Sequence, residues 1–168
     1  ADELLRADHA PAITVDLGEQ VDLAALAGEL AANLGGRAAR GGVDLAAEFA
    51  GPLLVSGSRD RLKQALLNLL DNALRSTPPG GAITISGGRR DGRIELLVRD
   101  TGPGVPPALR EAVWERGVRG ADGGSGLGLA IVKAIAEAHG GAATLLPAER
   151  GAAFLLRFPP PADPSAPA

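Results

Sequence analysis

Short connections between apolar segments constrain the fold of this 168-residue chain more than any other feature. Residues 82–86 and 94–99 flank the sequence Arg89-Arg90-Asp91-Gly92, and residues 143–146 are followed closely by residues 153–158. Connections this short join antiparallel strands, because parallel neighbours need a crossover of a dozen or more residues. The sequence therefore predicts a sheet that is antiparallel or mixed.

Three amphipathic helices are predicted between the strands, because apolar residues recur there at helical spacing. They cover residues 21–34, 60–75 and 127–139. The pairs Gly35-Gly36 and Gly140-Gly141 follow the first and third of these segments, and glycine in such positions is a typical helix stop.

Two further strand predictions complete the pattern. Residues 43–49 and 52–55 suggest a hairpin that turns at Ala50-Gly51, and residues 13–17 suggest an edge strand. Helices that alternate with hairpins are typical of an α/β fold. The predicted architecture is a two-layer α/β sandwich, in which a mixed, mostly antiparallel sheet packs on about three helices.

Composition excludes several classes of function. The formal net charge of −3 and the absence of Tyr leave neither a basic field nor a set of stacking platforms, so nucleic acid is not an expected partner. The chain has no Cys, which excludes disulfides and thiolate metal sites. It has no apolar run of about 18 residues and no charged-then-apolar leader, so we expect no membrane insertion of this segment.

The helix predicted over residues 60–75 also has a polar face. Gln64, Asn68 and Asn72 are four residues apart, so they share one side of the helix, opposite the leucine stripe. A solvated or hydrogen-bonded face is the simpler explanation. In a functional interpretation, Asn68 and Asn72 give oxygen ligands to Mg²⁺, which takes few protein ligands beside waters and phosphates. Arg75 would then reach the same phosphates.

A second polar cluster is the sequence Asp100-Thr101-Gly102-Pro103-Gly104-Val105 at the end of a predicted strand. It can be a turn that leaves a sheet, where Asp and Gly are common. Alternatively, the carboxylate accepts a hydrogen bond from the exocyclic amine of a buried base, and the glycines let backbone lie against the ring. Such a contact selects adenine, since guanine has a carbonyl where adenine has its amino group.

A third cluster, Gly124-Ser125-Gly126-Leu127-Gly128-Leu129, opens the last predicted helix. Amides in the first turn of a helix have no partner within it, so this end can bind phosphate. A flexible glycine-rich linker is the alternative. The P-loop and dinucleotide-binding patterns are both absent from the sequence.

In this order, the three clusters resemble the nucleotide-binding boxes of the histidine kinase and gyrase-type ATPase superfamily, and in particular the catalytic domain of a sensor histidine kinase. The boxes correspond to residues 68–73 (N box), 100–105 (first glycine box), 113–116 with Arg119 (F box) and 124–129 (second glycine box). The resemblance covers roughly residues 21–158.

The resemblance implies a Bergerat-type sandwich with ATP and Mg²⁺ as cofactors. Asn68 and Asn72 would hold the metal and phosphates, and Asp100 would bind adenine. Asn68 and Arg119 would be catalytic, with Arg119 directed at the γ-phosphate. Other nucleotide contacts are expected from Arg75, Gly102, Gly104, Val105, Gly124, Ser125, Gly126, Leu127 and Gly128.

The chain departs from the family pattern at several positions, among them Gly117-Val118, where the family usually has Phe-Tyr, and the short segment between Arg119 and Gly124. Trp114 replaces the usual Phe of the F box, and Ser76 stands where an aromatic residue often packs near adenine. The segment from about residue 105 to residue 125 is expected to form a lid over the nucleotide.

The implied function is transfer of the γ-phosphoryl group to a histidine on a separate dimerisation domain, with a response regulator downstream. His9 is followed by Ala10 and not by the acidic residue expected after an acceptor histidine, and it lies in no long amphipathic helical hairpin. His139 is better explained as a helix cap. ATPases of the same fold use a Glu as general base where this chain has Asn68, and an amide cannot take that proton. An anti-sigma-factor-type serine kinase and a degenerate nucleotide-sensing module are the remaining alternatives.

We expect three segments in the chain. Residues 1–16 would connect to a missing dimerisation region, residues 17–158 would be the ATP-binding catalytic domain, and residues 159–168 would be a disordered Pro/Ala tail. The domain is expected to be cytoplasmic, in a parent protein anchored in the cell membrane.

Overall fold

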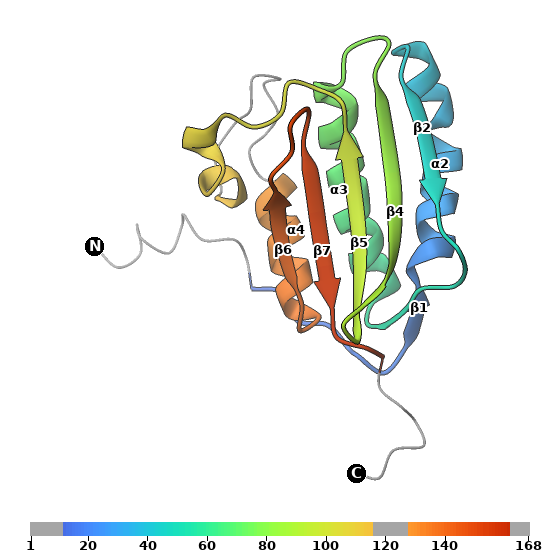
Figure 1. Ribbon diagram of the computed structural model, residues 1–168. Coiled ribbons are helices and arrows are strands. Elements are labelled where there is room, and N and C mark those ends of the chain that lie inside the picture. Colours follow the sequence, from blue (N-terminus) through green and yellow to red (C-terminus); the bar gives the residue numbers. More distant parts are fainter. Residues whose placement is uncertain (1–11, 116–127, 162–168) are drawn as a thin grey trace.

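The computed structural model describes residues 12–115 and 128–161 of the chain (Figure 1). Its α-helices are α2 (Leu23–Arg40), α3 (Arg59–Ser76) and α4 (Gly128–Ala138). Its strands are β1 (Gln20–Asp22), β2 (Asp44–Glu48), β3 (Leu54–Ser56), β4 (Ala82–Arg90), β5 (Arg93–Asp100), β6 (Ala142–Leu146) and β7 (Ala153–Phe158). Two 3₁₀ turns, η1 (Pro107–Leu109) and η2 (Ala112–Trp114), follow β5.

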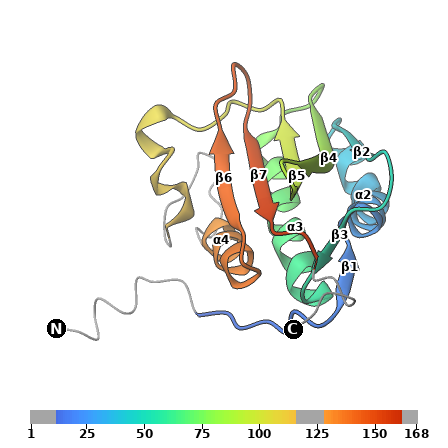
Figure 2. The ribbon, with the colours of Figure 1, turned by 60° about the horizontal axis from the view of Figure 1, so that its bottom comes forward.

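The fold has two layers, as the sequence predicts. Five strands form one sheet in the order β2-β4-β5-β7-β6, and β1 pairs with β3 in a small second sheet. α2, α3 and α4 all cover the same face of the large sheet (Figure 1). Figure 2, in which the bottom of that view is turned forward, shows the helices as a layer beside the sheet. Only β2 and β4 are parallel among these paired strands, so the sheet is mixed and mostly antiparallel.

The central helix, α3, supplies much of the core. Its apolar stripe is almost completely buried, at 1% exposure or less, and consists of Leu62, Ala65, Leu66, Leu69, Leu70 and Ala73. This stripe belongs to one core cluster with sheet residues such as Ile85, Leu96 and Phe154. Ser58 begins the helix by accepting a hydrogen bond from the Arg61 amide at 3.3 Å. No helix in the described part of the chain could cross a membrane.

The predicted hairpin over residues 43–55 is wrong. β2 pairs in parallel with β4, and β3 pairs antiparallel with β1. A parallel pair needs a long crossover, and α3 provides it. The Leu53 amide donates to Asp22 Oδ1 at 3.0 Å, and the Leu23 amide donates to the Leu53 carbonyl at 2.8 Å. These long-range bonds direct the chain toward β1 instead of back along β2.

Two other boundaries also differ from the sequence prediction. Residues 13–17 form no strand, and pairing begins only at Gln20. α2 continues through Gly35-Gly36 to Arg40, because the following turn buries Ala38 to 2% exposure against the core. That burial offsets part of the cost of about 1 kcal/mol for each glycine inside a helix. The helix ends where the Gly42 and Val43 amides bond to the Ala39 and Ala38 carbonyls.

His139 is a buried polar side chain at the end of α4, with 1% exposure. Its Nδ1 lies 2.7 Å from the Ile135 carbonyl and its Nε2 accepts a hydrogen bond from the Ser58 amide at 3.1 Å. The carbonyl can only accept, so Nδ1 carries the proton and the ring is neutral. Burial lowers the pKa of His139 below its ordinary value of 6.5, although the bond to Ile135 acts in the opposite direction.

Stability should therefore depend on pH through His139. Below pH 6.5 the unfolded chain binds a proton that the folded chain still excludes, so the free energy of unfolding falls as pH decreases toward the folded pKa. Urea unfolding between pH 7.5 and 5.5 should show this slope in the wild-type chain. His139→Gln should flatten the slope, whereas His9→Gln, at the other histidine, should leave it intact. An unchanged slope in His139→Gln would assign the effect to other groups.

Candidate functional site

Two asparagines lie on the half-buried side of α3, one helical turn apart. Asn68 and Asn72 both keep partial exposure, in contrast to the fully buried stripe on the same helix. The Asn68 Nδ2 donates to the carbonyl of Gly128, the first residue of α4, at 3.3 Å. The structure thus brings the predicted N-box residue beside the residue where the glycine cluster meets its helix. With its nitrogen used in this way, Asn68 keeps Oδ1 for a ligand.

The two amides are a weak metal site by themselves. Among the described residues, no group of three or more His, Cys, Asp or Glu side chains is placed to hold a metal ion. Asn68 and Asn72 could hold only an ion that takes most of its ligands from water and phosphate. Mg²⁺ is such an ion, because it accepts neutral oxygen donors and keeps several waters. The donor set therefore fits Mg²⁺ only in company with a phosphate group.

Arg75, a predicted phosphate ligand, is engaged elsewhere. Its Nε lies 3.0 Å from Asp71 Oδ2, and Arg37 of α2 bonds to the other oxygen of Asp71 at 2.9 Å. All three side chains are 40–45% exposed, so each pair contributes at most about 1 kcal/mol. The cavity described below is not lined by Arg75, nor by Asn68 or Asn72. Arg75 lies on the same helix as Asn72, three residues later, and its phosphate contact stays a prediction.

Asp100 is a buried acid at the end of β5, with 2% exposure. Its Oδ1 accepts hydrogen bonds from the Gly102 amide at 2.9 Å and the Ala152 amide at 3.3 Å. Among the described residues, no donor is bonded to Oδ2. Burial raises the pKa of Asp100 above 3.8, and the two amide bonds counteract part of that rise. The two amide bonds therefore fix the orientation of the carboxylate, and its Oδ2 is available to accept a hydrogen bond.

A cavity of about 710 Å³ is lined by Thr101 and Gly102, the two residues that follow this acid, and Asp100 itself is not among its lining residues. The first glycine box forms one wall through Gly102, Gly104 and Val105, and Ser76 contributes the end of α3. The Ser76 hydroxyl donates to the Asn72 carbonyl at 2.9 Å, so it turns back onto its own helix. No bulky side chain covers the cavity at this position, where the family pattern has an aromatic.

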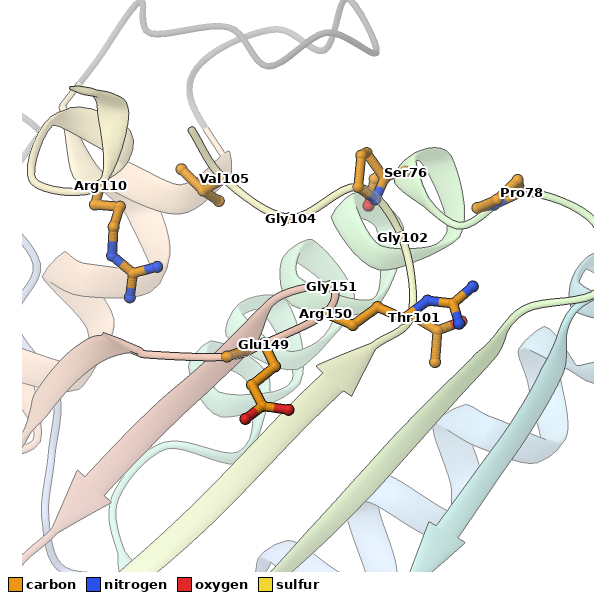
Figure 3. Close-up of a pocket in the computed structure, with 12 residues that line it drawn as sticks. Ser76, Pro78, Thr101, Gly102, Gly104, Val105, Arg110, Glu149, Arg150 and Gly151 are labelled. Carbon is orange, nitrogen blue, oxygen red and sulfur yellow. The ribbon is translucent and has the colours of Figure 1, made fainter. Parts of the chain in front are cut away.

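Several wall residues were not predicted from the sequence. The turn between β6 and β7 lines the cavity with residues 148–151, and Arg110 lines it from the end of η1 (Figure 3). Arg150 extends from that turn toward Thr101 in the same view. Arg110 donates to the Leu145 carbonyl at 3.3 Å. A charged turn between two strands gives no local signal of a binding wall, and only the strand pairing brings it here.

The remaining predicted site residues, Arg119, Gly124, Ser125, Gly126 and Leu127, lie outside the described residues. The F-box residue Trp114 lies within them. Its ring packs edge-on against Phe154 with centroids 5.5 Å apart, so the replacement of Phe by Trp retains an anchor on the core.

Comparison with known proteins places these features in context. Residues 57–162 match the family model described as "Histidine kinase-, DNA gyrase B-, and HSP90-like ATPase". The chain is 49% identical over 102 residues to the sensor protein DivL of Caulobacter vibrioides, a match that covers 60% of this chain and 13% of DivL. The chain spans about a quarter or less of the first curated relatives.

Two solved structures are similar over most of the chain. The mycobacterial sensor histidine kinase MprB superposes with a TM-score of 0.77 at 35% identity, covering 86% of this chain and 100% of that one. Full-length ShkA in complex with AMPPNP superposes with a TM-score of 0.75 at 34% identity, covering 89% of this chain and 32% of that one.

The turn at Gly151 should be intolerant of a side chain. Its φ is +73°, and a Cβ there would overlap the Asp100 carbonyl oxygen. Gly151→Ala should lower the free energy of unfolding by about 1–3 kcal/mol in chemical denaturation. Gly88→Ala is the matched control, since a Cβ there meets open space. Equal stability of the two variants would show that the turn is not packed on Asp100 as described.

Proposed function

This chain belongs to the histidine kinase-, DNA gyrase B- and HSP90-like ATPase family, on its sensor histidine kinase branch, and we propose that it binds Mg-ATP and donates the γ-phosphoryl group to a histidine of a separate dimerisation domain. In this proposal residues 17–158 are the catalytic domain, residues 1–16 connect to the dimerisation domain and residues 159–168 are a tail. The domain works in the cytoplasm, in a membrane-anchored parent protein with a response regulator as its downstream partner.

The observation that carries the proposal is the hydrogen bonding of Asp100. One carboxylate oxygen is occupied by two backbone amides, and the other has no donor among the described residues. Asp100 Oδ2 is not one of the fully buried side-chain atoms of the described residues that lack a partner, so a ligand that donates to it can replace solvent there. The exocyclic amine of adenine is such a donor, and the cavity of about 710 Å³ lined by Thr101 and Gly102 is large enough for a base.

The metal and phosphates are assigned to the other end of the site. Asn68 and Asn72 would hold Mg²⁺ together with the phosphates, and the first turn of α4, beginning at Gly128, would donate its amides to the phosphates. Arg119 is proposed to contact the γ-phosphate. When bound, Mg²⁺ supplies positive charge that neutralises the transferring group.

The chain's own role is then to position the nucleotide. The acceptor imidazole on the other domain attacks the γ-phosphorus, the bond to the bridging oxygen breaks, and ADP leaves. Water is a poor alternative acceptor, because Asn68 cannot take its proton. The ATPase and serine-kinase branches of the family are the competing assignments, and acceptor specificity separates them.

Adenine recognition should depend on Asp100. In Asp100→Asn the remaining oxygen can keep both backbone amides, but an NH₂ group then faces the amine of the base. Loss of a charged hydrogen bond costs about 1.5–3 kcal/mol, or roughly 10- to 150-fold in ADP affinity by titration calorimetry. Glu95→Gln on the same strand is the control and should bind ADP normally. Unchanged ADP affinity in folded Asp100→Asn would place the base elsewhere.

Metal dependence should depend on Asn72. Asn72→Ala removes a Mg²⁺ ligand, so it should reduce the gain in ATP affinity that Mg²⁺ provides and leave ADP binding in chelator unchanged. Gln64→Ala, two helical turns earlier on the same face, is the control. If both variants gain as much from Mg²⁺ as the wild type, Asn72 is not a ligand.

Phosphoryl transfer itself can be tested with radiolabelled ATP. The chain alone should hydrolyse ATP very slowly and acquire no label, because Asn68 cannot act as a base for water and the proposed acceptor histidine lies on a separate domain. Addition of the parent's dimerisation domain should give an acid-labile phosphohistidine on that domain, by raising the effective concentration of the acceptor. The same domain with its histidine replaced by alanine should stay unlabelled. Rapid Mg²⁺-dependent hydrolysis by the chain alone would assign it to the ATPase branch instead.

A further inference from the structure

Two hydrogen bonds join α3 to α4, one at each end of α4. At the start of α4, the Asn68 side chain donates to the Gly128 carbonyl at 3.3 Å. Beyond its last residue, His139 Nε2 accepts from the Ser58 amide at 3.1 Å. Ser58 is the N-cap of α3, so the second bond ties the beginning of one helix to the end of the other.

The two bonds are matched in spacing. The ten residues from Ser58 to Asn68 span about 15 Å of helix, and the eleven from Gly128 to His139 span about 16.5 Å. The helices therefore run antiparallel with both bonds made at nearly the same axial separation. A slide of α4 along α3 would break both bonds together.

The His139 ring is held so that its Nε2 faces the Ser58 amide. Its Nδ1–H is committed to the Ile135 carbonyl at 2.7 Å, which leaves the Nε2 lone pair directed at the Ser58 amide. The Phe158 ring packs edge-on against it at a centroid distance of 6.1 Å. The ring also lies directly over Gly57, where a Cβ would overlap the imidazole. The end of α4, Phe158 at the end of β7 and the backbone at Gly57 together fix the position of the ring.

We propose that His139 is a positioning residue for the nucleotide site. It sets the axial position of α4 on α3, and so it places the first turn of α4 (the Gly128 turn) relative to Asn68 and Asn72. This inference rests on the proposed function, since it assumes that the Gly128 turn contacts phosphate. His139 itself touches no nucleotide in this account. It acts from the opposite end of α4, through the length of the helix.

The test compares His139→Leu with His139→Gln in this chain. Leu removes the acceptor, whereas the Gln side-chain oxygen can still accept from Ser58. Mg-ATP affinity should fall about five- to tenfold or more in the Leu variant, within the usual range of coupling between sites, and recover in the Gln variant. Ile94→Val, a buried change in the sheet, is the control for general loss of stability and should bind Mg-ATP normally. Equal affinity of folded His139→Leu and wild type would overturn the inference.

A measurement on the wild-type chain does not depend on any variant folding. Coupling is reciprocal, so saturating Mg-ATP should slow hydrogen exchange of the Ser58 amide, which is bonded to His139 and remote from the site. An unchanged exchange rate with nucleotide bound would contradict the inference and leave the proposed function standing. Failure of the wild type to bind Mg-ATP at all would instead contradict the proposed function and, with it, the inference.

Discussion

The rest of the site depends on the pair of amide bonds to Asp100 Oδ1. A carboxylate at 2% exposure is unfavourable unless donors surround it, and here the donors come from Gly102 and Ala152. These residues belong to segments far apart in sequence, the loop after β5 and the turn just before β7. The same two bonds therefore hold the charge in place and join the two walls of the cavity. Because both converge on one oxygen, the other is left for a ligand.

α3 divides its surface between stability and function. Its leucine stripe is the centre of the core, so the helix cannot shift without loss of packing. Asn68 and Asn72 are consequently held on a rigid element, as a precise ligand site requires. The helix also makes the crossover that allows β2 to lie parallel to β4. One element thus fixes the sheet order, the core and the position of the proposed metal ligands.

The sequence predicted the elements whose structure depends on residues close together in the chain. The hairpins β4-β5 and β6-β7, the stripe of α3 and the acid at the end of β5 all follow from periodicity and turn chemistry. The pairing partners of β2 and β3 could not be predicted in this way, because neither strand pairs with its neighbour in sequence. Likewise, Arg75 was expected at the phosphates, and its Nε pairs with Asp71, which also pairs with Arg37 from another helix, so its phosphate contact stays a prediction. The wall at residues 148–151 reaches the site only through strand pairing. Arg119 and residues 124–127, predicted on family resemblance, stay predictions.

The central claim is that the available oxygen of Asp100 accepts a hydrogen bond from adenine. Its most direct test is a carboxyl ¹³C NMR titration of Asp100 with and without ADP, assigned with Asp100→Asn. In the free chain burial should hold the pKa of Asp100 above 3.8. A donor on Oδ2 stabilises the ionised form, so saturating ADP should lower that pKa. A pKa that is unchanged or raised by bound ADP would contradict the account, because the base would then donate nothing to Asp100.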